Sequence, residues 1–167
     1  MSTPTELLWR ALRQEGADFF VSVPCKLLGN MINLLQEAED VVYTPVSREE
    51  EGVGLLAGAW LAGRTPVMIM QNSGLGNSVN AILSLLHYYR IPAVFVMSHR
   101  GSDGETIEAQ FQMGSAVANL LTATRVPYYE LSSVDDLNVL PEAMATAREK
   151  GQPVGLLLPF SFWKGDA

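Results

Sequence analysis

Cysteine is almost missing from this chain of 167 residues, in which Cys25 stands alone. A single thiol cannot form a disulfide within the chain, which is typical of proteins in a reducing compartment. The first 16 residues, MSTPTELLWRALRQEG, carry charges early and lack the apolar run of a signal peptide or a membrane span. These absences predict a cytoplasmic protein with no membrane segment.

Positive charge is also scarce. The chain has 11 Lys and Arg residues against 18 Asp and Glu residues, which gives a net charge of -7, and no basic cluster interrupts this excess. Such a surface repels a phosphate backbone, so we expect no nucleic-acid partner. No Cys/His spacing suits a structural metal either, and we therefore expect no metal site in this chain.

Apolar residues are abundant, at 48% against 17% for charged residues, which indicates a globular interior rather than disorder. The length predicts one domain. Short segments that are apolar throughout predict six strands, at 19–24, 41–46, 65–71, 91–98, 126–131 and 153–159. Such strands, separated by helices, are typical of a parallel sheet that is covered on both faces. We therefore predict an α/β, doubly wound, mainly parallel six-stranded sheet with helices on both faces.

Segments of helical periodicity lie between the strands and predict helices at 5–15, 30–39, 78–89 and 108–121. A further helix begins after a cap at Ser132 or Ser133, and Pro141 must either kink it or begin a new one. The segment NSGLGN (72–77) is predicted to be a turn. Because ligands bind at the carboxyl ends of parallel strands, the loops after residues 24, 46, 71 and 98 are expected to carry the site.

The segment VSREEEGVGLLAGAWLAG (46–63) places three glutamates ahead of a helix rich in glycine. Ser47 and Glu50 have the spacing of a capping box, and from the local pattern alone all three glutamates can equally be solvated caps. Glycine in a helix interior costs about 1 kcal/mol relative to alanine, and nothing local offsets that cost.

Small residues fall on one face of this helix, at Gly54, Gly58 and Ala62. A smooth face permits another helix or another subunit to approach closely. We therefore expect a close contact here with another helix or another subunit, which draws one of the glutamates into a dry interface.

Two segments, VSREEEGVGLLAGAWLAG and MQNSGLGNSVNAI, together carry a family resemblance. The chain resembles the pyrimidine-binding (PYR) domain of thiamin diphosphate enzymes, especially the sulfopyruvate and phosphonopyruvate decarboxylases, from VSVPCKLL to the last strand. The resemblance implies that residues 1–167 form a single PYR-type domain of a decarboxylase. It implies a small anionic 2-oxo acid as substrate, either 3-sulfopyruvate, which gives sulfoacetaldehyde and CO2, or phosphonopyruvate, and the sequence hardly separates the two.

In this family, a glutamate before the small-residue helix protonates the ring nitrogen of the cofactor's aminopyrimidine and so promotes ylid formation. The family register implies this role for Glu49, with Glu50 as the alternative. The resemblance also places Asn72, Ser73 and Gly74 beside thiamin diphosphate.

Enzymes of this family hold the diphosphate and Mg2+ in a second (PP) domain, through a Gly-Asp-Gly motif followed by paired asparagines. This chain lacks that pattern. The resemblance therefore implies that this chain binds only the pyrimidine half of the cofactor. It also implies a separate beta subunit that carries the PP domain and Mg2+, in a hetero-oligomer.

Polar side chains of the loops are the candidates for binding the substrate: Cys25, Lys26, His99, Arg100 and Gln112. A cationic or amide donor suits the charged tail of a 2-oxo acid. For Lys26, an ordinary surface lysine is an equal alternative. For Arg100, the alternative is a salt bridge to Asp103 or Glu105.

A function of another class also remains open from the sequence. The chain could be a non-catalytic, flavodoxin-like binding or regulatory module whose glutamates are only helix caps. A complex without thiamin diphosphate, and without a partner carrying the Gly-Asp-Gly pattern, would favour that interpretation.

Overall fold

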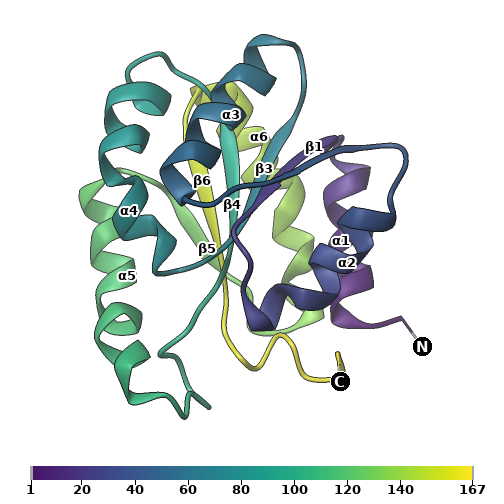
Figure 1. Ribbon diagram of the computed structural model, residues 1–167, viewed down its shortest axis with the longest axis vertical. Helices are drawn as coiled ribbons and strands as arrows, with labels where there is room; N and C mark the ends of the chain where they lie inside the picture. The colour runs from purple at the N-terminus through teal and green to yellow at the C-terminus, as the bar shows by residue number, and fades with distance from the viewer. Residues whose placement is uncertain (1, 167) are drawn as a thin grey trace.

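A computed structural model describes residues 2–166, which form one six-stranded sheet flanked by helices (Figure 1). The strands are β1 (Phe19–Ser22), β2 (Val42–Pro45), β3 (Pro66–Gln71), β4 (Ala93–Ser98), β5 (Tyr128–Glu130) and β6 (Pro153–Leu158). Their order is β2-β1-β3-β4-β6-β5, and every neighbouring pair is parallel. The predicted α/β fold and all six predicted strands are confirmed.

Helices cover both faces of the sheet (Figure 1). One face carries α1 (Pro4–Gln14), α2 (Gly29–Glu37) and α6 (Leu140–Lys150). The other carries α3 (Glu49–Leu61), α4 (Gly74–Ala81) with its π-helical continuation η2 (Ile82–His87), and α5 (Phe111–Ala123). Residues 2–166 also contain three short 3-10 helices, η1 (Lys26–Leu28), η3 (Glu108–Gln110) and η4 (Val134–Val139).

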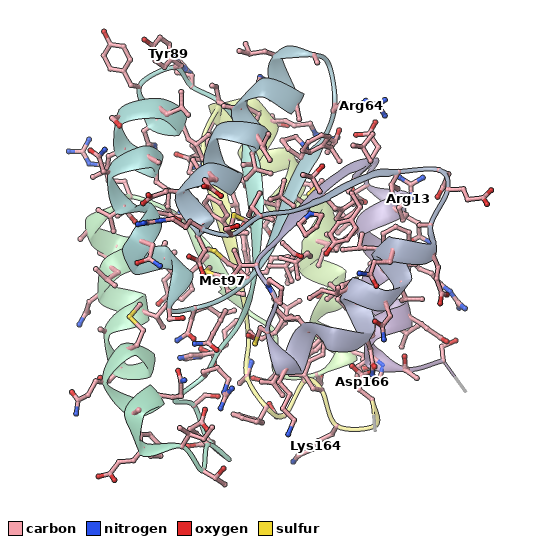
Figure 2. All side chains as sticks on the ribbon, in the orientation of Figure 1. Arg13, Arg64, Tyr89, Met97, Lys164 and Asp166 are labelled. Carbon is pink, nitrogen blue, oxygen red and sulfur yellow. The ribbon has the colours of Figure 1, made fainter. Side chains whose placement is uncertain are left out.

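The strands alternate their side chains between two cores. In β3, Val67 and Ile69 pack against the α1–α2–α6 face, while Met68 and Met70 pack against the α3–α4–α5 face. Met97 of β4 belongs to the second core, and Figure 2 shows it at the middle of the molecule. Because both faces are covered, β4 and β6 are buried at every position, which explains why the strands read as apolar without alternation.

Two sequence predictions about helix starts are wrong. The segment 72–77, predicted to be a turn, contains the first turn of α4, which begins at Gly74. The capping box of Ser47 and Glu50 does not form, because α3 begins at Glu49 with Arg48 at its N-cap and no side-chain cap. Glu50 instead pairs with Arg48, whose Nε lies 3.1 Å from Glu50 Oε1.

The helix start predicted after β5 at Ser132 or Ser133 is confirmed, and the structure decides between the two roles predicted for Pro141. Ser133 and Asp136 form a capping box at the start of η4. Pro141 lies in the first turn of α6, so it begins a new α-helix rather than kinking one.

Gly52 explains how α3 lies so close to the sheet. A Cβ at this position would come within 2.9 Å of Met68 Cε and 3.0 Å of Val21 Cγ1. The glycine therefore lets the first turn of α3, which begins with Glu49, lie close to β1 and β3. None of the helices among residues 2–166 has the length and apolar character needed to cross a membrane.

Candidate functional site

The candidate site lies at the carboxyl ends of β1, β3 and β4, which are neighbours in the sheet. Chain order reverses between β1 and β3, and in open α/β sheets the crevice at such a reversal is where ligands bind. The loops after β1, β3 and β4 therefore converge where the sequence analysis expected a site.

Glu49 lies at the first position of α3 and is only 8% exposed. Its Oε2 accepts a hydrogen bond from Asn77 Nδ2 at 2.9 Å. Its Oε1 accepts no hydrogen bond within residues 2–166. The side chain lies against Gly74: a Cβ on that residue would come within 2.7 Å of Glu49 Cδ and Oε1. The first turn of α4 thus contacts the carboxyl of Glu49 through Gly74 and Asn77, and leaves Oε1 without a hydrogen bond.

Gln71, the last residue of β3, joins the three loops. Its Nε2 donates to Ser73 Oγ at 2.7 Å and to Gln110 Oε1 at 3.1 Å. Its Oε1 lies 3.7 Å from Cys25 Sγ, which is also 3.4 Å from Ser98 Oγ. The half-buried Cys25 and Ser73 are therefore held in one polar network that continues along the chain into Gly74 and Asn77.

Asn72 joins the loop after β3 to the loop after β4. Its side chain is fully buried, and both of its polar atoms bond the backbone of Arg100: Nδ2 donates to the carbonyl at 3.0 Å, and Oδ1 accepts from the amide at 3.1 Å. These two bonds hold the loops together from within the protein.

Arg100 is buried in an ion pair with Glu105, which is one of the two pairings that the sequence left open. Arg100 Nε and Nη2 donate to the two carboxylate oxygens at 2.7 and 2.9 Å. The backbone amides of Gly101, Thr106 and Ile107 add three more bonds to Glu105. The hydrogen bonds from Arg100 are the largest cause that lowers the pKa of Glu105, to about 2, while the same pair raises the pKa of Arg100.

The remaining candidates are not brought together. His99 Nε2 lies 3.2 Å from the carbonyl of Gly114 in α5, while its buried Nδ1 has no partner within residues 2–166. Lys26 and Gln112 are both exposed. Gln110, two residues before Gln112, is the glutamine whose side chain reaches the Gln71 network.

An uncharged surface lies next to Glu49. No Asp, Glu, Lys or Arg occurs in residues 52–63 or 65–89, which span most of α3 and all of α4 and η2. Gly54 and Gly58 are exposed, and a Cβ on either would meet nothing within 4 Å. Within the described chain nothing requires glycine at these two positions, unlike at Gly52. The exposed strip of Gly54, Gly58 and Ala62 is hereafter the small-residue strip.

Three residues of the site escaped the sequence analysis: Gln71, Asn77 and Gln110. Gln71 is the one polar residue in the buried strand β3, and its position at the carboxyl end could have marked it. Asn77 was missed because its segment was predicted to be a turn. Gln110 reaches its partner only through tertiary folding of the segment 101–110, which no local pattern reveals.

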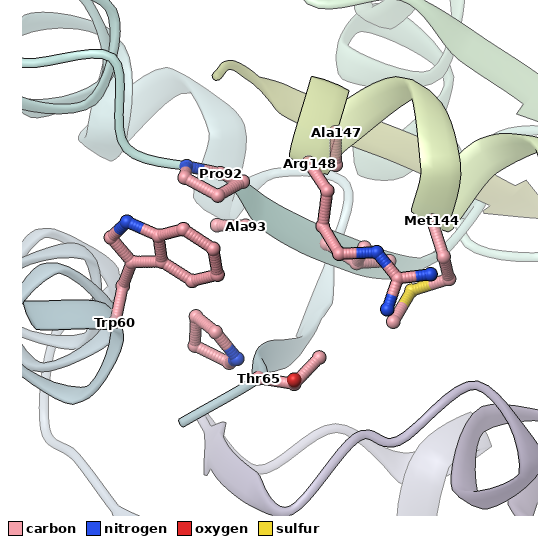
Figure 3. Close-up of a pocket in the computed structure, with 9 residues that line it drawn as sticks. Trp60, Thr65, Pro92, Ala93, Met144, Ala147 and Arg148 are labelled. Atoms are coloured by element: carbon pink, nitrogen blue, oxygen red, sulfur yellow. The ribbon is translucent and has the colours of Figure 1, made fainter. Parts of the chain in front are cut away.

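Hollows also occur away from this site, and one of about 600 Å3 is lined by Ser102, Asp103, Phe160 and Lys164. An apolar pocket lies at the opposite edge of the sheet, where β3 and β4 begin; Trp60 and Arg148 stand on two sides of it (Figure 3). Its volume of about 10 Å3 holds one water molecule at most. Within residues 2–166, no group of three or more His, Cys, Asp and Glu side chains is arranged to hold a metal ion.

Curated relatives match almost the whole chain. The sulfopyruvate decarboxylase subunit alpha of Methanococcus maripaludis is 40% identical over 163 residues, which cover 97% of this chain and 98% of that protein. The sulfopyruvate decarboxylase of Methanosarcina acetivorans is 32% identical over 161 residues, 96% of this chain and 41% of that protein. The phosphonopyruvate decarboxylase of Streptomyces viridochromogenes is 37% identical over 147 residues, 86% of this chain and 37% of that protein. A scan against protein-family models finds no match.

Solved structures share the fold. The thiamine diphosphate-dependent 4-hydroxybenzoylformate decarboxylase of Rhodococcus jostii RHA1 superposes with a TM-score of 0.74 at 18% identity, over 97% of this chain and 31% of that one. The 2-oxoglutarate:ferredoxin oxidoreductase of Magnetococcus marinus gives a TM-score of 0.73 at 14% identity, over 97% of this chain and 29% of that one. At these identities the likeness concerns the fold, which agrees with the PYR-type fold expected from the sequence.

Proposed function

Because this chain belongs to the family of sulfopyruvate decarboxylase alpha subunits, we propose that it is the alpha subunit of a thiamin diphosphate-dependent carboxy-lyase. The reaction is the conversion of 3-sulfopyruvate to sulfoacetaldehyde and CO2. The observation that carries the proposal is the match to an alpha subunit over 97% of this chain and 98% of the relative. A match of that extent at 40% identity argues against a non-catalytic module that merely shares the fold.

Glu49 is the proposed catalytic residue, and its surroundings fit the pyrimidine half of thiamin diphosphate. The carboxyl is nearly withdrawn from water, one of its oxygens is free, and no cation pairs with it among the described residues. Gly74 provides the room that the carboxyl itself occupies, because a Cβ on that residue would come within 2.4 Å of Glu49 Cγ and 2.7 Å of Cδ and Oε1. When bound, the cofactor supplies the carbanion chemistry of decarboxylation. The task of Glu49 is to hold a proton at Oε1 and deliver it to the ring nitrogen.

Ser73 is proposed to lie beside the thiazolium and the substrate, held there by Gln71. Asn72 is proposed to act indirectly, because its hydrogen bonds to the backbone of Arg100 hold the loop that carries Ser73 in place. Both roles are those of groups that hold a reactive centre in a fixed geometry.

A beta subunit is proposed to complete the site by binding the diphosphate and Mg2+ in a PP domain. The relative from Methanosarcina acetivorans supports this arrangement, since the chain corresponds to 41% of a longer protein with room for a second domain. The small-residue strip is the proposed contact, because it is exposed, uncharged and continuous with the Glu49 end of α3. Burial of the strip in a hetero-oligomer would remove Glu49 from solvent.

The charged tail of the substrate requires a cation or amide donors. Arg100 is committed to Glu105, so the exposed Lys26, beside Cys25 at the end of β1, is the stronger candidate for the sulfonate. His99, whose Nδ1 lacks a partner within the described chain, is a second candidate donor.

The test is co-expression of this chain with its beta subunit, followed by a cofactor assay of the purified complex and measurement of CO2 release from 3-sulfopyruvate. We expect thiamin diphosphate to be retained and CO2 to form. In the Glu49→Gln variant, the complex should assemble normally and lose turnover by about 10^2-fold or more, since this carboxyl carries the proton step. Full turnover in that variant would remove Glu49 from the mechanism.

Phosphonopyruvate is a second candidate substrate, and the 37% identity to a phosphonopyruvate decarboxylase supports it. Both compounds are three-carbon 2-oxo acids with an anionic tail. Turnover of each by the same complex decides between them, and equal rates would defeat the preference for the sulfonate.

A further inference from the structure

The hydrogen bond between Asn77 and Glu49 fixes the position of the carboxyl and also determines which of its two oxygens can carry a proton. A primary amide nitrogen is a donor without acceptor capacity. The oxygen that it contacts at 2.9 Å, Oε2, must therefore act as the acceptor, whether the carboxyl is charged or neutral. When the carboxyl holds a proton, that proton belongs on Oε1.

Oε1 is also the oxygen of the carboxyl that accepts no hydrogen bond within residues 2–166. It lies against Gly74, where a Cβ would come within 2.7 Å of it. The contacts with Asn77 and Gly74 thus give the carboxyl one oxygen that accepts from Asn77 and a second oxygen that is free to donate. Asn77 and Gly74 lie one turn apart on α4, so a single rigid element enforces both.

We propose that Asn77 is a positioning residue that directs the proton of Glu49 to Oε1, the oxygen that serves the aminopyrimidine. This inference rests on the proposed function of Glu49 and deepens it. Asn77 itself does not touch the reacting atoms. Without it the carboxyl can move out of its fixed position, and the proton can also reside on the other oxygen, so the donor is misplaced relative to the ring nitrogen.

The experiment uses the assembled complex of this chain and its beta subunit. Wild type and the Asn77→Ala, Asn77→Gln and Asn80→Ala variants are compared. Asn80 is a matched control, because it lies on the same helix, is exposed, and its side chain makes no hydrogen bond within residues 2–166. Three quantities are measured: the rate of deuterium exchange at C2 of the bound cofactor without substrate, the Michaelis constant for 3-sulfopyruvate, and the dissociation constant of thiamin diphosphate.

A positioning role predicts that Asn77→Ala lowers the exchange rate by about 10^2-fold, the usual effect of misplacing a reacting group by about 1 Å. The Michaelis constant and the dissociation constant should stay within about twofold of wild type, as should all three quantities for Asn80→Ala. Asn77→Gln keeps an amide donor and should retain more exchange than Asn77→Ala. In the cofactor-free complex, the 13C resonance of the Glu49 carboxyl should shift in Asn77→Ala and not in Asn80→Ala.

The outcomes separate this inference from the proposed function. If Glu49→Gln abolishes exchange while Asn77→Ala exchanges at the wild-type rate, Glu49 keeps its role and the inference about Asn77 is wrong. Loss of cofactor binding in Asn77→Ala with no change in exchange per bound cofactor would also overturn it, since that pattern indicates a merely structural residue. If Glu49→Gln itself exchanges normally, the proposed function of Glu49 and the inference fall together.

Discussion

Replacing Gly74 by alanine tests whether the contact between α4 and Glu49 sets the position of the carboxyl. The added Cβ would lie 2.4 Å from Glu49 Cγ and 2.7 Å from Cδ and Oε1, whereas an ordinary contact begins at 3.4 Å. The Glu49 side chain must therefore move by about 1 Å. Gly74 is followed by the rest of a regular helix, so the backbone of α4 cannot easily yield instead.

The expected cost of this shift is large for turnover and moderate for stability. A misplacement near 1 Å lowers the rate by about 10^2-fold, which corresponds to about 2.7 kcal/mol of transition-state free energy. Overpacking of this kind lowers the free energy of unfolding by about 1 to 3 kcal/mol. Both quantities are measured on the complex, turnover by CO2 release and unfolding by urea.

Gly76→Ala is the matched control. It lies two residues away on α4, and a Cβ there would meet nothing within 4 Å. We expect this variant to raise the free energy of unfolding by about 0.5 to 1 kcal/mol, because alanine is the better helix former. If Gly74→Ala behaved like Gly76→Ala in both stability and turnover, the idea that Gly74 positions the Glu49 carboxyl would be refuted.

Two further predictions concern the loop after β4 and the small-residue strip. Because its folded pKa of about 2 lies below the usual value of 4.5, Glu105 contributes stability that is present above pH 4.5 and is lost as pH falls towards 2. The urea midpoint of Glu105→Gln should therefore lie well below wild type at pH 7, with the gap narrowing across that window; a gap independent of pH would contradict the pairing. Gly58→Leu should weaken binding of the beta subunit by about tenfold or more without lowering the stability of the chain. Asn119→Leu, on the exposed face of α5, is its control, and unchanged affinity in Gly58→Leu would place the contact elsewhere.

The strands and the fold class could be predicted from the sequence because they depend on local apolar runs. A strand covered on both faces must be apolar at each position, and β3, β4 and β6 display that signal without ambiguity. The start of α4 could not be predicted in this way. Gly74 and Gly76 read as a turn, and only the packing of Gly74 against Glu49 explains a glycine in the first turn of a helix.

Site residues could be predicted where a single position matches a known pattern. They could not be predicted where the role of a residue depends on contact with a partner that is distant in the sequence. Glu49 was indicated by its family register, and the structure places it at the first position of α3 with 8% of its surface exposed. The sequence offered Arg100 two roles, and the choice of the ion pair depends on the path of residues 101–105, which brings Glu105 back to it. The role of Asn77 depends on a partner 28 residues away, and Gln71 bonds both its neighbour Ser73 and Gln110, which is 39 residues away.

The strand order has a consequence for how the protein is made. β6 is synthesised after the other five strands of the described sheet, yet it lies between β4 and β5, and within residues 2–166 it is the one strand with which β5 pairs. A nascent chain that has not reached residue 153 therefore holds β4 with an unpaired, apolar edge and β5 without its neighbour. Such edges favour association with other chains. The unfinished chain is thus expected to be more prone to aggregation than the chain in which β6 has joined the sheet.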